Sequence, residues 1–139
     1  MAGGLLPVLK GVYVCDDVIG NPVGGKPMIV NLWDTYWVSA NTPFPVAVQK
    51  LCAFAWLRGG RGRFSFRVDI VSAKSGEVIG RTRQQEINPT EPNLSVYAKF
   101  MISNFMFPEP GTYFVELFCD DEFLDDQPIR VRVRAESGS

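Results

Sequence analysis

The stretch Phe64-Ser65-Phe66-Arg67-Val68-Asp69-Ile70 alternates aromatic or aliphatic residues with polar ones. A period of two residues is typical of a β-strand that turns one face to a core and the other to water. We therefore expect the polar side chains Arg67 and Asp69 to be exposed. The four apolar side chains are expected to be buried on one face, namely Phe64, Phe66, Val68 and Ile70.

The same alternation recurs in Ile129-Arg130-Val131-Arg132-Val133-Arg134, and six further segments are extended in character. Those six cover residues 9–15, 28–33, 51–57, 77–83, 95–102 and 113–119. Turn-forming residues separate the segments at a spacing of roughly ten residues, which is typical of sandwiches and small barrels. The sequence therefore predicts an all-β, immunoglobulin-like two-sheet antiparallel β-sandwich of seven to nine strands. A closed barrel is the alternative.

A chain of 139 residues is long enough for one hydrophobic core and too short for two ordinary domains. We expect a single sandwich domain over residues 8–134, with a flexible N-terminus at 1–7 and a disordered tail at 135–139. Two explanations remain open for Pro110-Gly111-Thr112-Tyr113. Tyr113 could form a tyrosine corner, in which the hydroxyl bonds to backbone a few residues upstream, or it could be a core tyrosine after a plain turn.

The sequence argues against catalysis and against insertion into a membrane. Histidine is absent, which removes the commonest general base and metal ligand. Cys15, Cys52 and Cys119 are widely spaced and lie in apolar sequence, so they are expected to be reduced core thiols rather than nucleophiles or disulfides. No apolar run approaches the ~20 residues of a membrane helix, and the start lacks the pattern of a secretory signal. We expect a cytoplasmic protein that is not an enzyme, has no cofactor and does not bind a membrane.

Several short motifs occur in a characteristic order along the chain. They are Tyr13-Val14-Cys15-Asp16-Asp17, Asn31-Leu32-Trp33-Asp34, Phe44-Pro45, Ser75-Gly76-Glu77 and Phe107-Pro108-Glu109-Pro110-Gly111-Thr112-Tyr113. In this order they resemble a family of uncharacterised bacterial proteins described only as a domain of unknown function. The resemblance runs over nearly the whole chain and implies a cytosolic β-sandwich. It supplies no activity, catalytic residue or cofactor.

Aromatic residues between positions 36 and 45 are the strongest candidates for partner binding. Tyr36, Trp37 and Phe44 lie among Ser, Asn, Thr and Pro residues that favour loops. Interfaces are enriched in aromatic residues, so we expect this loop to bind another protein, with Trp37 and Phe44 as apolar anchors. Alternatively, both rings fold back over an open end of the sandwich. A carbohydrate-binding platform that includes Trp33 is a further alternative.

Acidic residues suggest a second kind of site. Calcium prefers several oxygen ligands that converge from loops, as in C2-like calcium- and lipid-binding sandwiches. The candidate ligands for this alternative are Asp16, Asp17, Asp120, Asp121 and Asp126. No second Asp-x-Asp loop completes such a site, so the main prediction remains that no metal is bound.

The net charge of −1 gives no overall attraction to nucleic acid, and the arginines of the last strand are expected to form a solvated face. The sequence thus predicts a non-enzymatic binding or scaffolding module. Its partner is expected to be another protein rather than nucleic acid or membrane, and a homo-oligomer is compatible with this prediction.

Overall fold

The computed structural model describes residues 4–20, 26–90 and 94–135. These residues form ten strands and no helix. The strands are β1 (Val8–Ile19), β2 (Met28–Leu32), β3 (Thr35–Val38), β4 (Val46–Arg58), β5 (Phe64–Ser72), β6 (Val78–Arg81), β7 (Gln85–Ile87), β8 (Ser95–Phe107), β9 (Gly111–Cys119) and β10 (Glu122–Val133). None of the described residues forms a helix that is long and apolar enough to cross a membrane.

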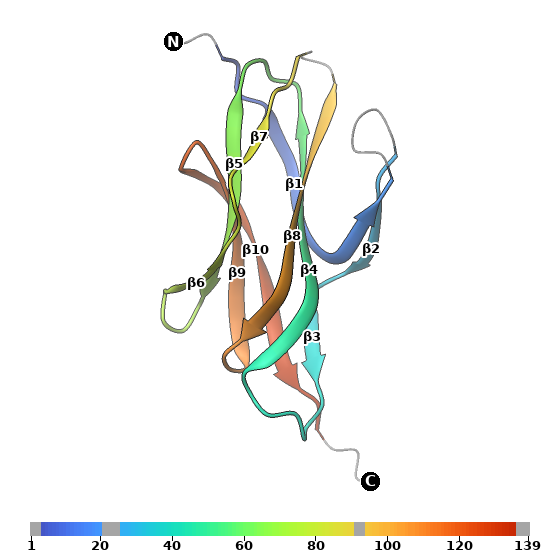
Figure 1. Cartoon of the computed structure of the whole chain (residues 1–139), viewed down its shortest axis with the longest axis vertical. Helices are drawn as coiled ribbons and strands as arrows, with labels where there is room; N and C mark the ends of the chain where they lie inside the picture. Colours follow the sequence, from blue (N-terminus) through green and yellow to red (C-terminus); the bar gives the residue numbers. More distant parts are fainter. Residues whose placement is uncertain (1–3, 21–25, 91–93, 136–139) are drawn as a thin grey trace.

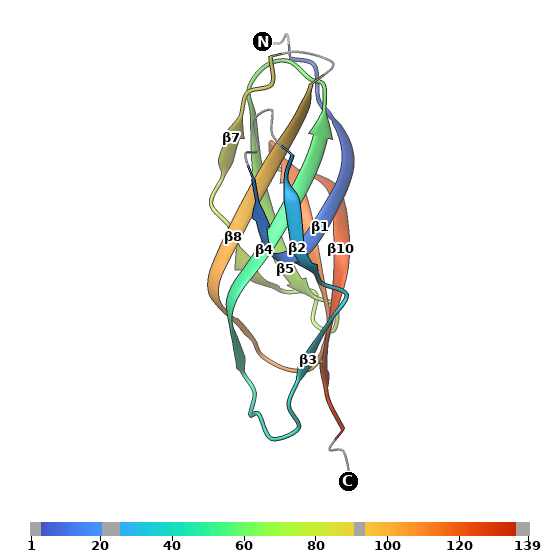
Figure 2. The same cartoon turned by 90° about the vertical axis from the view of Figure 1, so that its right-hand side faces the viewer.

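The strands form two sheets that face each other (Figure 1). One sheet has the order β2-β1-β4-β8, and Figure 2 views it from its outer side. The other has the order β3-β10-β9-β5-β6, and β7 also pairs with β5. The predicted two-sheet β-sandwich is therefore confirmed.

Two details of this architecture differ from the prediction. The chain bends after β2, passes to the other sheet and runs as β3 parallel to β10, so not every strand pair is antiparallel. The predicted strand at 77–83 is the shorter β6, and the sequence analysis did not predict β7, which follows it and pairs with another part of β5. Because of these two additions, the structure has ten strands instead of seven to nine.

The core lies between the two sheets and contains the inward-facing side chains of both. Its largest fully buried members include Phe66, Ile70, Leu51, Leu57, Phe107, Tyr113, Leu117 and Ile129. The strand register predicted for β5 is confirmed, because Phe64, Phe66, Val68 and Ile70 are all buried.

The prediction that Arg67 and Asp69 are exposed is wrong. Asp69 is only 2% exposed, and the side chain of Arg67 is 13% exposed. Strand β6 pairs with β5 at Asp69, and the β9–β10 turn contacts Arg67 through Asp121. These two elements cover the outer face of β5, which the alternating pattern alone had assigned to water.

Tyr113 forms the tyrosine corner. Its side chain is buried, and its hydroxyl donates a hydrogen bond of 2.5 Å to the carbonyl oxygen of Glu109. This bond ties the start of β9 to the turn before it, which is the arrangement found at corners of Greek-key sandwiches. Burial raises the pKa of Tyr113, which keeps the hydroxyl protonated as a donor.

The ends of the chain are described in part. Within the N-terminal segment that was expected to be flexible, Leu5 exchanges two backbone hydrogen bonds with Arg61, of 2.7 and 2.8 Å. Residues 1–3 and 136–139, which complete the predicted flexible ends, lie outside the described residues.

Candidate functional site

The predicted aromatic loop is largely a strand. Tyr36 and Trp37 belong to β3, where they pair in register with Val131 and Arg132 of β10. The expectation that both residues lie in a loop is therefore wrong, because parallel pairing with the last strand orders this segment. Successive side chains of a strand point to opposite faces, so Tyr36 and Trp37 have different surroundings.

Of the three residues predicted to bind a partner, two pack on the core. The ring of Tyr36 stacks on Trp33 with centroids 5.0 Å apart, and Phe44 is partly buried against the core cluster. Trp37 is 47% exposed, and the guanidinium of Arg134 lies 5.3 Å from its ring centroid. The folded-back alternative, which concerned Trp37 and Phe44, therefore holds for Phe44 and not for Trp37, whose ring stays on the surface.

The acids proposed as calcium ligands are divided between the two sheets. Asp16 accepts hydrogen bonds of 2.7 Å from Trp33 Nε1 and from Asn31 Nδ2. Asp17 forms a 2.7 Å ion pair with Lys99, and this contact holds the pKa of Asp17 below its usual value.

On the other sheet, Asp120 accepts a 2.9 Å hydrogen bond from the backbone N–H of Ser65, and Asp121 pairs with Arg67. Asp126 lies in β10. In the described part of the chain, no group of three or more His, Cys, Asp or Glu residues could hold a metal ion. The carboxylates of Asp16, Asp17, Asp120 and Asp121 instead make contacts within the fold.

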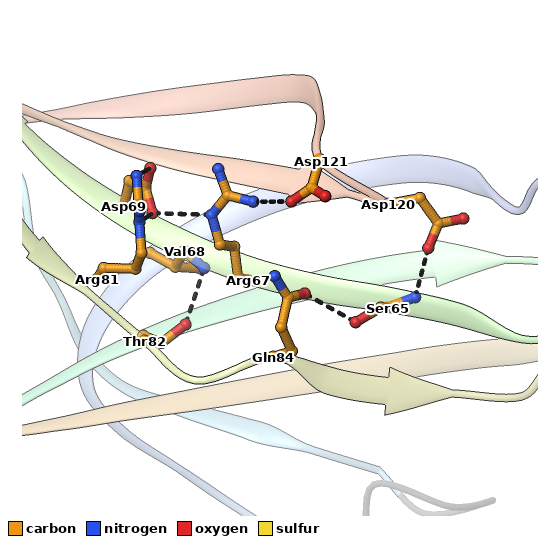
Figure 3. Close-up of polar contacts among 9 residues, drawn as sticks. All are labelled: Ser65, Arg67, Val68, Asp69, Arg81, Thr82, Gln84, Asp120 and Asp121. Carbon is orange, nitrogen blue, oxygen red and sulfur yellow. Dashed lines mark hydrogen bonds and ion pairs between the residues drawn. The ribbon is translucent and has the colours of Figure 1, made fainter.

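The most elaborate polar cluster surrounds the buried carboxylate of Asp69 (Figure 3). Arg81 binds it with both ends of its guanidinium, through Nε–Oδ1 and Nη2–Oδ2 distances of 2.9 and 3.0 Å. Arg67 Nε adds a contact of 3.2 Å to Oδ1. Burial raises the pKa of Asp69, but the hydrogen bonds and charges of Arg81 and Arg67 outweigh burial, so the pKa lies below its usual value.

Hydrogen bonds continue from this cluster to neighbouring segments (Figure 3). Thr82 exchanges two bonds of 2.9 Å with the backbone of Val68, and Ser65 Oγ donates to Gln84 Oε1 at 2.7 Å. Asp69 faces two guanidinium groups, so it is held in its charged form and is poorly suited to act as a general base. The cluster therefore fixes β6 and the β9–β10 turn onto β5 and has a structural role.

All three cysteines are buried and unpaired, as the sequence predicted. Cys15 and Cys52 are register partners on β1 and β4, and neither has exposed surface. A hydrogen bond to Cys15, together with burial, raises the pKa of Cys52. A hydrogen bond from Cys52 lowers the pKa of Cys15, against the effects of burial and of Asp16. Since neither sulfur reaches solvent, neither is placed to act as a nucleophile.

The sequence analysis missed a cavity on the outer face of the β2-β1-β4-β8 sheet, the face seen in Figure 2. We call it the aromatic cavity. It is open to solvent, has a volume of about 480 Å³ and is lined by Tyr13, Lys26, Pro27, Ile29, Phe54, Trp56 and Tyr97. This volume lies within the range of small-ligand sites in proteins.

Strand pairing brings the rings of the aromatic cavity together. Tyr13 is the register partner of Phe54, and Trp56 is the partner of Tyr97. Phe54 and Tyr97 stack with centroids 5.5 Å apart and an interplanar angle of 14°. Trp56 is held by a 3.2 Å hydrogen bond from Nε1 to Ser95 Oγ.

Gly11 sets the position of Tyr13. A Cβ atom at Gly11 would lie 2.6 Å from the Tyr13 hydroxyl and 2.8 Å from the adjoining ring carbon, so the ring lies along its own strand, over the glycine. Any larger residue at position 11 would push this ring away. The glycine therefore fixes one wall of the aromatic cavity without being part of its lining.

One signal in the sequence could have indicated this cavity. Residues 51–57 form an unbroken apolar run, which we interpreted only as core strand. An antiparallel sandwich normally has one solvated face on each sheet, so a strand that is apolar on both faces needs a cover or a ligand on the outside. The outward residues of that run are Cys52, Phe54 and Trp56, of which Phe54 and Trp56 line the cavity.

Comparison with known proteins places the chain in a family. The sequence profile of DUF6941, described as a family of unknown function, matches residues 10–132. The chain belongs to this family. The resemblance found in the sequence to a domain of unknown function is thereby confirmed. The comparison with curated proteins found no match.

Among solved structures, this member of DUF6941 is similar to the Pseudomonas fluorescens alkylpurine DNA glycosylase AlkC bound to DNA containing an abasic site analog. The sequence identity is 11% and the TM-score is 0.42. The match covers 87% of this chain, which spans only 30% of the glycosylase chain. A likeness of this size carries no argument about function.

Proposed function

We propose that this DUF6941 protein is a non-enzymatic module that binds another protein by holding an extended segment of it in the aromatic cavity. The observation that supports this is the cavity itself, in which four aromatic rings lie on the outer face of a sheet that would otherwise be solvated. Aromatic residues in an open hollow offer a large apolar contact area at a small entropic cost, which is typical of protein-binding surfaces.

The chemistry of the lining disfavours the two alternatives. Sugars carry many hydroxyl groups that both donate and accept hydrogen bonds, yet the described lining includes no Asp, Glu, Asn or Gln. A calcium site needs converging oxygen ligands, and the candidate acids instead bind Lys99, Arg67 and backbone N–H groups.

The finer predictions about fold and location belong to the same proposal. The parallel pairing of β3 with β10 and the corner formed by Tyr113 support immunoglobulin-like connectivity. Three buried and unpaired cysteines support a reducing compartment, namely the cytoplasm of a bacterial cell.

A library of random peptides displayed on phage tests the proposal, because selection from it does not require the natural partner. Peptides selected on the wild-type protein are expected to bind Trp37→Ala unchanged and to lose binding to Trp56→Ala. The Trp37 variant is a matched control, because it removes the same side chain from the other sheet. If Trp37→Ala lost binding and Trp56→Ala kept it, the aromatic cavity would not be the site, and peptides would bind at the residues around Trp37 that the sequence predicted.

Trp56 is half-buried, so its removal could also loosen the fold. Gly11→Ala is the second variant, since it displaces the ring of Tyr13 without changing the identity of any lining residue. Thermal melting checks that each variant is folded. A folded Gly11→Ala protein that binds the selected peptides as tightly as the wild type would contradict the proposed site.

A further inference from the structure

The side chains that line the aromatic cavity offer few strong hydrogen-bond acceptors. The ammonium group of Lys26 can only donate, the hydroxyls of Tyr13 and Tyr97 can donate and accept, and the indole N–H of Trp56 is already bonded to Ser95 Oγ. The described lining contains no carboxylate and no side-chain amide, which are the strong acceptors of proteins. A ligand that complements this surface is therefore rich in acceptors and poor in donors.

Most peptides do not meet this requirement. An ordinary extended peptide carries one N–H donor for every carbonyl, and each donor loses free energy when it is buried without an acceptor. Proline has no N–H group. In the polyproline II conformation the carbonyls form no internal hydrogen bonds and point outward, so a proline-rich segment presents acceptors almost alone.

The shape of the lining fits the same ligand. Tyr13 lies along β1 over Gly11, Phe54 and Tyr97 are stacked, and Trp56 is fixed by Ser95. These rings project from a sheet face, so a ligand lies on side chains rather than along a strand edge. Aromatic-lined grooves of this kind bind proline rings, and they gain from a polyproline helix that is stiff before it binds.

Charge adds one further restriction. Lys26 is the only charged residue among the described lining residues. Lys99 is the register partner of Phe54, but its charge is matched by the 2.7 Å ion pair with Asp17. A carboxylate in the ligand would therefore be attracted to the rim at Lys26.

We propose that the aromatic cavity binds a proline-rich segment in the polyproline II conformation, flanked by an acidic residue that faces Lys26. This inference rests on the proposed function and names the class of segment that the module holds. The lining favours a proline-rich segment, because its backbone carries few N–H donors. Lys26 at the rim favours the acidic residue.

An oligoproline peptide with a glutamate at each end tests this inference by titration into ¹⁵N-labelled protein. The chain has three tryptophans, and each gives an indole N–H signal. The Trp56 signal is expected to shift while the Trp37 signal does not. Replacing alternate prolines with alanine is expected to weaken binding about tenfold, and Gly11→Ala is expected to weaken it to a similar degree.

The charge requirement is tested with lysine in place of the terminal glutamates. The wild type is expected to prefer the glutamate peptide at low salt and to lose that preference at high salt, because exposed charges are screened. Lys26→Ala is expected to abolish the preference and keep the requirement for proline. Equal binding of the alanine and proline peptides, or binding that shifts Trp37 and not Trp56, would overturn the inference.

The outcomes separate the inference from the function on which it rests. If library peptides without proline bind at Trp56, the module binds protein segments and the proline inference is wrong. If an oligosaccharide shifts Trp56 and no peptide does, both are wrong and the site takes sugars. If neither peptides nor sugars bind, both proposals are also wrong.

Discussion

Asp69→Asn removes the negative charge that holds two guanidinium groups against β5. Removing one partner of a fully buried ion pair costs about 3–5 kcal/mol, because the other charge is left uncompensated. The side chain of Arg81 is 55% exposed and can return to water, and Arg67 keeps its contact with Asp121. We therefore expect a loss of about 2–3 kcal/mol in the free energy of unfolding, below the range for a fully buried pair.

Urea denaturation at pH 7 measures this loss. With a urea dependence of about 1.5 kcal/mol/M, the midpoint is expected to fall by about 1.3–2 M at an unchanged slope. Asp121→Asn is the control, because its side chain is 79% exposed and an exposed ion pair contributes at most about 1 kcal/mol. Equal midpoints for Asp69→Asn and the wild type would refute the role assigned to the cluster.

The same substitution has a defined pH dependence. The folded-state pKa of Asp69 is depressed, because Arg81 and Arg67 outweigh burial. Its stabilising effect is therefore fully present above the unfolded-state pKa of about 3.9 and is lost as pH falls through the folded-state pKa. The difference in stability between wild type and Asp69→Asn should shrink below about pH 4. A difference that stayed constant down to strongly acidic pH would show that the charge of Asp69 is not what stabilises the fold.

Three further substitutions test other parts of the structure. Tyr113→Phe removes the corner hydrogen bond and is expected to cost about 1–2 kcal/mol, seen as a lower melting temperature; an unchanged melting temperature would contradict this. Glu116→Gln is expected to raise the urea midpoint at pH 7. Burial and the charges of Asp126 and Asp69 raise the pKa of Glu116, so the stability linked to its protonation is lost as pH rises, and a lower midpoint would argue against this. Trp37→Ala is expected to change stability by less than about 1 kcal/mol, whereas a plug in the core would lose about 3 kcal/mol or more.

Alternation along single strands predicted the fold well. The four apolar residues of β5 are buried as expected. Tyr113 forms the tyrosine corner, which was one of the two explanations left open for it. The pattern identifies the two faces of a strand, but it does not say which segment returns to cover the outer one. Asp69 was therefore assigned to water, although the next strand places Arg81 directly on it. Likewise, β3 was expected to be a loop, because its partner β10 lies almost at the far end of the sequence.

The aromatic cavity shows why the candidate site was harder to predict than the fold. Its rings come from β1, β4 and β8, and what unites them is the register between strands rather than any motif within one strand. Gly11, the register partner of Trp56, matters most, because its missing side chain leaves room for the ring of Tyr13. In the sequence alone, Gly11 is an ordinary break in a strand and Trp56 one more member of an apolar run. In a two-layer sandwich, a strand that is apolar throughout buries one face in the core and leaves the other on the outside of its sheet. The register with neighbouring strands decides whether that outer face is covered or is open to a partner.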